Sequence, residues 1–410
     1  MRIGGGPRIF FINRFFFPDH SATSQMVSDL AFHLARCGHD IQVITSQQLY
    51  EDARASLPRS ELVDGVHIHR IPTTRFGRSG LLGRAFDYVS FYALMWRYVR
   101  RLARRGDIIV AKTDPPLLCI PAMIAARKRG GILVNWLQDV YPEVAIRLDV
   151  PFVKGRVGKT LSYLRDASLR AAKANVVVGD LMAETLRQRG ISGECIHVIP
   201  NWCDDEDIHP SAAVANPLRR KWGLGNYFVV GYSGNLGRVH EFDTVLAAAE
   251  RLRNDSNILF LFIGGGKKLD ELVRHVRKRN LDHVFRFMPY QERAVLKFSL
   301  AVPDVHLVSL KPELEGLIVP SKFYGVAAAG RPLIALTARN GELAELVRQH
   351  GCGLVIEPGD ADALVAALRY LSDNEESATT MGRRARQMLD GHFSRQHAFN
   401  RWRSLLESIA

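Results

Sequence analysis

Cysteine is scarce in this chain, and its distribution shows no pairing pattern. The 410 residues include five cysteines, which are widely scattered and contain no CxxC spacing. An odd number of cysteines without such spacing argues against a disulfide framework and against a structural zinc site. It is typical of a reducing compartment, so we expect a cytoplasmic protein.

Long apolar runs are also missing. No stretch reaches the roughly 18 uninterrupted apolar residues of a membrane span. The apolar segment 9–17 is interrupted by Asn13 and Arg14 and is followed by no small-residue cleavage site, so it predicts a buried strand. The sequence contains no GxxxxGK[ST], HExxH or GxSxG pattern, which argues against a P-loop ATPase, a zinc protease and an α/β-hydrolase.

Acidic residues are outnumbered by basic ones. There are 42 Asp and Glu against 55 Lys and Arg, which gives a net charge of +13. Much of this excess lies in one segment that holds a single acid, Asp87. Its arginines are Arg75, Arg78, Arg84, Arg97, Arg100, Arg101, Arg104 and Arg105.

On a helical wheel, the segment 84–105 separates into two faces. One face gathers Tyr88, Phe91, Met95, Trp96, Tyr98, Val99 and Leu102. The other carries Arg97, Arg100, Arg101 and Arg104. This pattern suits a helix on an anionic membrane surface, and it equally fits a helix that packs on the core with a solvated basic face. Nucleic acid is a third interpretation, which no zinc-finger, RNP-type or heptad pattern supports. We expect no nucleic-acid partner and a peripheral location on the inner face of the cell membrane.

Strand and helix signals alternate along the whole chain. In the first half, β-branched apolar runs occur at Ile9–Ile12, Ile41–Thr45, Val66–Ile71, Ile108–Ala111, Ile132–Trp136, Asn175–Val178 and Ile196–Ile199. In the second half they occur at Phe228–Tyr232, Ile258–Ile263, Val284–Phe287, Val305–Leu310, Pro332–Thr337 and Gly353–Ile356. Helical patterns between them include Ser24–Cys37, Thr244–Arg253, Leu269–Arg279 and Asp360–Leu371. Such alternation predicts parallel sheets covered on both faces.

The length of the chain predicts two domains, because single cores rarely grow beyond about 250–300 residues. We place the join near 200–217, which is rich in Asn, Asp and Pro. The expected fold is therefore α/β, with two doubly wound, Rossmann-like domains, 1–205 and 206–394. Ligands of such sheets bind beyond the carboxyl ends of the strands, so two facing domains would form a cleft.

Three loops of the second half follow strands where a ligand is expected. The first contains Gly234, Asn235 and Gly237 and ends at Arg238, and the second contains Gly264 and Gly265. One glycine loop carries little information, because glycine is the usual turn residue. Three loops on one edge of one domain, each with a basic residue, together predict a site for a nucleotide diphosphate.

The third loop, 315–332, leads into a helix. Glu315, Gly316 and Leu317 precede Pro320, and Ser321 is a candidate N-cap before Lys322. Gly330 is a candidate for the left-handed residue that ends the helix. A helix N-terminus with a lysine attracts phosphate, although a capped helix with a surface lysine is also commonplace.

Strand ends in the first half carry polar residues instead. Asp19, His20 and Ser21 follow the first strand, with groups suited to sugar hydroxyls, and Asp139 follows the strand at 132–136. Any one of these carboxylates is more often a helix cap or turn former than a catalyst. Asp139 is the strongest single candidate. The consecutive acids 204–207 predict a solvated linker rather than a metal site, because adjacent residues do not converge on one ion.

The order of these segments resembles a family 4 glycosyltransferase of the GT-B fold, and within that family the bacterial cell-surface polysaccharide enzymes of the colanic-acid type. The segments that carry the resemblance are FPDHSATSQMVSDLAFHLARCGHDIQVIT (17–45), NWLQDVYPE (135–143), IPNWCD (199–204), GYSGNLGRVHEF (231–242), FIGGG (262–266) and EGLIVPSKFYGVAAAGRPLI (315–334). They span nearly the whole chain.

The resemblance implies an enzyme that transfers a sugar from a UDP- or GDP-sugar, with retention, to a saccharide or lipid-linked acceptor, without a metal ion or other cofactor. It implies a donor site in 206–394, an acceptor site in 1–205 that includes Asp19, His20 and Ser21, and a last helix (395–410) that crosses back to the first domain. Arg238 and Lys322 would neutralise the leaving diphosphate and Asp139 would position the sugar or the acceptor hydroxyl. The loop residues that would bind the nucleotide are Gly234, Asn235, Gly237, Gly264, Gly265, Glu315, Gly316, Leu317 and Ser321.

Two features depart from the family pattern. The second glutamate of the family signature, which commonly binds the ribose, corresponds to Gly325. The phosphate-binding GRxxxxK pair is altered, and Arg238 is a displaced substitute. A nucleotide-sugar 2-epimerase of the same fold and a non-catalytic sugar- or membrane-binding protein are the alternatives.

Overall fold

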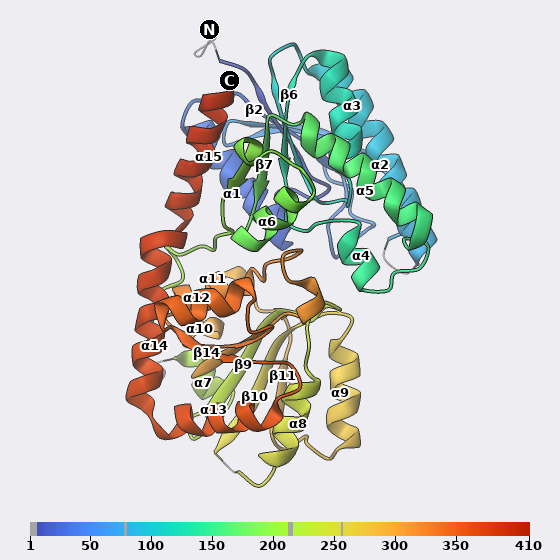
Figure 1. Cartoon of the computed structure of the whole chain (residues 1–410). Coiled ribbons are helices and arrows are strands. Elements are labelled where there is room, and N and C mark those ends of the chain that lie inside the picture. Colours follow the sequence, from blue (N-terminus) through green and yellow to red (C-terminus); the bar gives the residue numbers. More distant parts are fainter. Residues whose placement is uncertain (1–5, 78–79, 212–215, 256) are drawn as a thin grey trace. The chain divides into compact units, whose positions relative to one another are not determined.

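The computed structural model describes residues 6–77, 80–211, 216–255 and 257–410. The chain forms two compact units (Figure 1). The first contains Met1–Pro200 and Phe399–Ala410, and the second contains Asn201–Ala398. Arg78 and part of the predicted join, 212–215, lie outside the described residues.

The first unit is built on an eight-stranded sheet in the order β3-β4-β2-β1-β5-β6-β7-β8. Its strands are β1 (Ile9–Ile12), β2 (Ile41–Ser46), β3 (Ser60–Val63), β4 (Val66–Ile71), β5 (Ile108–Lys112), β6 (Ile132–Trp136), β7 (Ala174–Val177) and β8 (Ile196–Val198). All neighbours pair in parallel except β3 with β4. The sequence prediction missed β3, because this edge strand is half-exposed and lacks an apolar run.

Helices cover both faces of this sheet. They are α1 (Ala22–Arg36), α2 (Leu81–Leu102), α3 (Cys119–Arg129), α4 (Glu143–Arg147), α5 (Gly155–Ala171) and α6 (Asp180–Gln188). Helices α2, α3 and α5 lie together on one side of the sheet, and α1 and α6 lie on the other (Figure 1). The first unit is therefore doubly wound, as its strand and helix pattern predicted.

Helix α2 agrees with the second interpretation of its pattern, a helix that packs on the core and carries a solvated basic face. Phe91, Met95 and Val99 are fully buried against the sheet and α3, and Trp96, Tyr98 and Leu102 are partly buried beside them. The aromatic face of the predicted amphipathic helix is thus occupied by the core of the first unit. The arginine face, including Arg97 and Arg101, remains exposed.

The second unit contains a fully parallel six-stranded sheet in the order β11-β10-β9-β12-β13-β14. Its strands are β9 (Phe228–Asn235), β10 (Ile258–Gly265), β11 (Phe285–Met288), β12 (Val305–Ser309), β13 (Leu333–Leu336) and β14 (Gly353–Ile356). Each coincides with a predicted run. Strands β9 and β10 continue into the glycine loops that the sequence placed after them.

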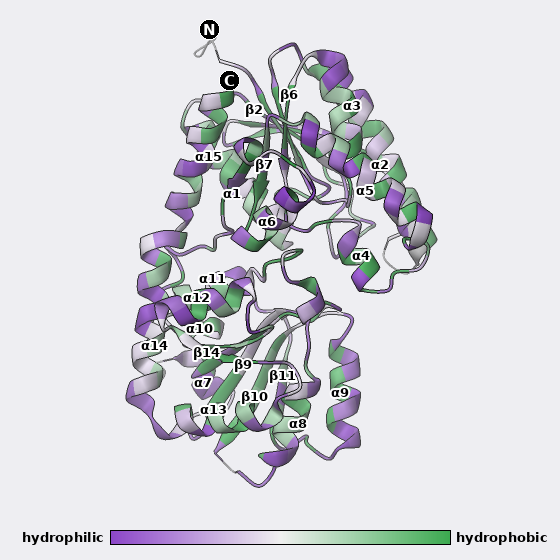
Figure 2. Cartoon of the chain, viewed as in Figure 1, coloured by the Kyte–Doolittle hydropathy of each residue, from purple (hydrophilic) through white to green (hydrophobic). Residues whose placement is uncertain are grey.

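Side chains of β10 alternate between the two faces of this sheet. Ile258, Phe260 and Phe262 join the core cluster that includes α8 (Asp243–Arg251), α9 (Leu269–Lys278) and α13 (Ala361–Asp373). Leu259, Leu261 and Ile263 pack in a cluster on the opposite face. The remaining helices are α7 (Pro217–Lys221), α10 (Leu296–Leu300), α11 (Lys322–Ala328), α12 (Glu342–His350) and α14 (Glu375–Met388). Strands of both sheets are mostly hydrophobic, and helices carry hydrophilic residues on their outer sides (Figure 2).

The chain returns to the first unit through its last helix. A π-helical turn (Leu389–Phe393) separates α14 from α15 (Arg395–Ile409). In the first unit, Trp402 is fully buried with its ring centroid 4.6 Å from that of Trp136, and Phe399 stacks on His33. The α/β class, the two parallel-sheet domains and the C-terminal helix are confirmed.

The acids at 204–207 are ion-paired rather than merely solvated. Arg395 pairs with Asp204 at 3.2 Å and with Glu206 at 2.6 Å, and Arg293 and Lys297 pair with Asp204 and Asp207. The Glu206 side chain is 80% exposed, so these pairs lie at the surface and agree with a solvated linker. Within the described ranges, no helix is both long and apolar enough to cross a membrane.

Candidate active site

Lys322 lies at the start of α11, beside the first glycine loop. Its Nζ is 3.1 Å from Nε2 of His240 and 5.4 Å from the centroid of the Tyr232 ring. A Cβ added to Gly234 would come within 2.9 Å of the Lys322 Cε, so a larger residue here would displace the end of the lysine side chain. Burial lowers the pKa of Lys322 to about 8. This lysine is therefore held close to the loop in a partly desolvated position.

The first two glycine loops pack directly against each other. A Cβ on Gly264 would meet the Gly234 carbonyl oxygen at 2.3 Å, and Gly264 has a φ of 135°, which disfavours any other residue. The Leu236 N–H donates to the Gly265 carbonyl at 2.7 Å. Asn235 and Arg238 are exposed on the first loop. The ends of β9 and β10 thus form one continuous backbone surface beside Lys322.

Part of the third loop is held by hydrogen bonds to neighbouring residues of the second unit. The Glu315 carboxylate accepts hydrogen bonds from the Thr337 hydroxyl and from the Glu342 N–H, at the start of α12. Burial raises the pKa of Glu315. Leu317 is buried and donates its N–H to the Leu314 carbonyl, so this N–H is used within the loop. Gly316, with a φ of 69°, makes the turn between them.

The helix that follows is capped only at its end. Ser321 precedes α11 in a helical conformation and makes no side-chain cap hydrogen bond, so the N-cap prediction is wrong. Gly330 has a φ of 64° and donates to the Ala327 carbonyl, while Arg331 donates to that of Val326. This is a Schellman ending, which confirms the predicted role of Gly330.

In the first unit, charged groups gather at the carboxyl ends of β5 and β6. The Lys112 Nζ lies 3.2 Å from the centroid of the Trp136 ring and is fully buried. Burial raises the pKa of Asp139 to about 6, with a further contribution from Asp114, while the nearby Lys112 opposes the shift. Burial also lowers the pKa of Lys112 well below its usual value. Asp139 thus lines a small cavity of about 20 Å³, together with other charged and aromatic groups.

The predicted acceptor residues have unequal surroundings. One oxygen of the buried Asp19 accepts from the N–H and the hydroxyl of Ser21, at 2.8 and 2.5 Å. The other accepts from the Tyr50 N–H at 2.5 Å. Two of the three residues are therefore committed to holding this loop, and only His20 is exposed. Contact with an acceptor remains a prediction.

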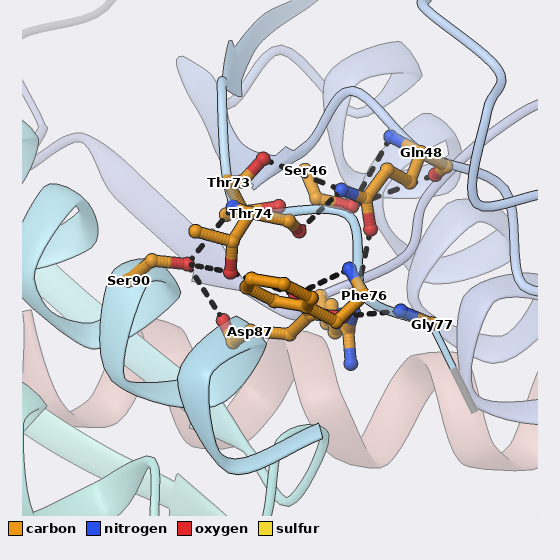
Figure 3. Close-up of polar contacts among 9 residues, drawn as sticks. Ser46, Gln48, Thr73, Thr74, Phe76, Gly77, Asp87 and Ser90 are labelled. Carbon is orange, nitrogen blue, oxygen red and sulfur yellow. Dashed lines mark hydrogen bonds and ion pairs between the residues drawn. The ribbon is translucent and has the colours of Figure 1, made fainter. Parts of the chain in front are cut away.

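A buried polar cluster joins α2 to the segments that follow β1 and β4 (Figure 3). One oxygen of Asp87, on α2, accepts from the Thr74 hydroxyl at 2.7 Å and from the Phe76 N–H at 3.1 Å. The other accepts from the Gly77 N–H at 3.0 Å and pairs with Arg14 at 3.2 Å. The single acid of the arginine-rich segment thus ties the segment after β4 to α2 and to the end of β1.

His240, Lys112 and Asp87 were not among the predicted site residues. Lys112 was visible as a lysine at a strand end, and His240 lies within a segment quoted for the family resemblance. Neither spacing nor composition reveals that a histidine meets a lysine 82 residues away. Only the folded sheet brings the ends of β9 and β12 together.

Comparisons with known proteins agree with this architecture. The family model for glycosyl transferases group 1 matches residues 215–388, and that for the glycosyl transferase 4-like domain matches 21–202. The probable glycosyltransferase WbjE of Pseudomonas aeruginosa is 26% identical, over 78% of this chain and 79% of that protein. The putative colanic acid biosynthesis glycosyl transferase WcaI of Escherichia coli K12 is 27% identical, over 86% of this chain and 89% of that protein.

Solved structures show the same fold at low identity. Anabaena Alr3699/HepE in complex with UDP superposes with a TM-score of 0.71 and 17% identity, over 98% of this chain and 100% of that chain. Sucrose-phosphate synthase from Thermosynechococcus elongatus superposes with a TM-score of 0.78 and 17% identity. The match covers 98% of this chain and 99% of that chain.

The two domains give this chain the GT-B fold, and the family models and relatives identify it as a glycosyltransferase. More specifically, the chain belongs to the family 4 glycosyltransferases, which confirms the resemblance found in the sequence.

Proposed function

We propose that this enzyme transfers a sugar from a UDP- or GDP-sugar, with retention of anomeric configuration, to a lipid-linked acceptor in the synthesis of a cell-surface polysaccharide. Two relatives support the donor class and the pathway. WcaI is named for colanic acid biosynthesis, and a Mycobacterium tuberculosis relative, 24% identical over 93% of this chain, is named a GDP-mannose-dependent alpha-mannosyltransferase. The HepE structure contains UDP, so both bases are retained in the proposal.

The observation that carries the donor site is the position of Lys322 against Gly234. A diphosphate approaching the ends of β9 and β10 would meet close-packed backbone on one side and an ammonium group on the other. Positive groups that face developing negative charge stabilise the transition state. Lys322, assisted by the exposed Arg238, would supply that charge, and we therefore expect turnover to persist in the presence of EDTA.

The acceptor side of the proposal rests on Asp139. Its raised pKa, near 6, leaves the carboxylate mostly ionised at neutral pH and yet poorly solvated. Such a group can orient a hydroxyl or the transferred sugar by accepting a hydrogen bond. His20, exposed at the end of the same sheet, is a candidate contact for the acceptor.

Membrane attachment is proposed on a different part of α2 than the sequence predicted. Leu82, Phe86 and Val89 are spaced along one helical face, and their exposed fractions are 75%, 61% and 62%. Phe76, 59% exposed, lies next to Phe86. The exposed arginines follow on the same helix. An apolar stripe beside basic side chains is what an anionic bilayer surface attracts.

The function is tested by assaying purified protein with UDP- and GDP-sugars and lipid-linked acceptors. Replacing Lys322 by Ala removes one charge-stabilising contact, and we expect kcat to fall by about 10²–10³. Lys278→Ala, at the exposed end of α9, is the matched control and should retain wild-type turnover. Near-wild-type turnover of Lys322→Ala would contradict the proposed role of Lys322 at the donor diphosphate. Conversion of donor alone would instead identify an epimerase, and binding of no nucleotide-sugar would identify a non-catalytic protein.

A further inference from the structure

We propose that His240 is a positioning residue, which holds the Lys322 ammonium in place for the donor diphosphate through a neutral, fixed imidazole. This inference rests on the proposed donor site and adds a residue to it. His240 is buried in the loop that follows β9, and its imidazole contacts the Lys322 ammonium.

The partners of the two ring nitrogens favour one tautomer. Nδ1 of His240 lies 2.7 Å from the backbone carbonyl of Ser309, which can only accept, so Nδ1 carries the proton. Nε2 is then the lone-pair nitrogen, and it accepts from the Lys322 Nζ at 3.1 Å. Burial, with the adjacent Lys322, lowers the pKa of His240 to about 3, so the ring stays neutral throughout the working pH range.

The histidine is itself held by two strand ends. The Glu241 N–H donates to the Ser309 hydroxyl at 2.7 Å, and that hydroxyl donates to the Glu241 carbonyl at 2.9 Å. The Lys311 N–H donates to the Val239 carbonyl at 3.0 Å. These bonds join the residues on both sides of His240 to the end of β12. The imidazole is therefore a rigid support for a side chain that has four rotatable bonds.

A neutral acceptor has a specific advantage at this position. Within the described part of the chain, no carboxylate lies within 4.0 Å of the Lys322 ammonium, so its positive charge is not compensated by an ion pair. A carboxylate in place of His240 would orient the lysine and also cancel its charge. The imidazole uses one N–H of the ammonium and leaves two donors and the full charge for an incoming diphosphate.

The test is a double-mutant cycle read by calorimetry with UDP and GDP, and with uridine and guanosine as phosphate-free probes. We expect His240→Leu to weaken binding of the nucleoside diphosphate by roughly tenfold and to leave nucleoside affinity unchanged. In a Lys322→Ala background, His240→Leu should have no further effect, because the two residues act as one unit. His240→Gln, which keeps an acceptor near the Nε2 position, should restore most of the affinity.

His283→Leu is the matched control, because that exposed imidazole also bonds to a backbone carbonyl, that of Arg253. It should leave nucleoside diphosphate binding unchanged. An equal loss of nucleoside and nucleoside diphosphate affinity in His240→Leu, or a full effect in the Lys322→Ala background, would overturn the positioning role alone. If the wild-type protein binds neither UDP nor GDP, the proposed donor site fails as well, so the two failures are distinguishable.

Discussion

Two side chains with shifted pKa values set a narrow pH range for the roles proposed above. Burial raises the pKa of Asp139 to about 6, and burial lowers that of Lys322 to about 8. The proposed roles require Asp139 as a carboxylate and Lys322 as an ammonium. Both conditions are met only between these two pH values, since Asp139 is protonated below the first and Lys322 is neutral above the second.

We therefore predict a bell-shaped dependence of kcat/KM on pH, with limbs near 6 and 8 that report the free enzyme. Lys322→Arg keeps the charge at all accessible pH values and should remove the alkaline limb. Asp139→Asn should lower kcat and remove the acid limb. A profile that is flat from pH 5 to 9, or an alkaline limb that persists in Lys322→Arg, would contradict these assignments.

The residues of the proposed donor site show which features a sequence reveals and which it does not. The glycine loops and Lys322 were predicted because each follows a strand, and parallel strands end at one edge. Glu315 and Leu317 were assigned to the nucleotide from their place in the motif, but their polar groups are used by Thr337 and Leu314. Local hydrogen bonds of this kind depend on a loop conformation that spacing does not encode.

Helix α2 shows the same distinction at the scale of one element. Its amphipathic pattern was real, but the apolar face belongs to the core, and the exposed stripe Leu82, Phe86 and Val89 lies in its first half. We predict that replacing these three residues by Ser weakens co-sedimentation with vesicles of anionic lipid by at least about tenfold, because less apolar area is removed from water.

Two controls accompany this experiment. Leu62→Ser, on the exposed strand β3, should leave vesicle binding unchanged. Exchange of Arg97, Arg101 and Arg104 for Glu should weaken binding to anionic vesicles and have little effect with neutral ones. Vesicle association that is unaffected by either set of changes would rule out attachment through α2.

The anchor of α2 is Asp87, and it gives a stability prediction. This carboxylate is fully buried, bonded to three groups of the segment 74–77 and paired with Arg14 (Figure 3). Asp87→Ala would leave the buried Arg14 without its counter-ion, and we expect a loss of about 3–5 kcal/mol in the free energy of unfolding. Denaturant titration measures this loss. Glu184→Ala, which breaks an exposed pair with Arg187, should cost less than about 1 kcal/mol.

Most elements of the fold were predictable, because buried parallel strands are continuous apolar runs and helices have a distinct period. Strand β3 was missed because its residues are half-exposed and pair antiparallel at the sheet edge. The ion pairs of Asp204 and Glu206 with Arg395 were also missed, since about 190 residues separate the partners in sequence.

At the scale of the whole molecule, the last helix contributes residues to both units. Its first residues, with Arg395, belong to the second unit, and residues from Phe399 onward belong to the first. Trp402 fills a fully buried position against Trp136 in the first unit. The nucleotide site, by contrast, is proposed entirely within the second unit. The stabilities of the two units should therefore respond to different changes.

We predict that Trp402→Ala lowers the stability of the first unit by about 3–5 kcal/mol, because a large cavity replaces a buried indole. A nucleoside diphosphate at 100 times its Kd should stabilise the second unit by about 2.7 kcal/mol, because it binds only the folded state. Differential scanning calorimetry should then resolve two transitions in Trp402→Ala, of which only the upper one moves with UDP or GDP. A single transition that both the substitution and the nucleotide shift together would show that the two units unfold cooperatively, and would contradict their independence.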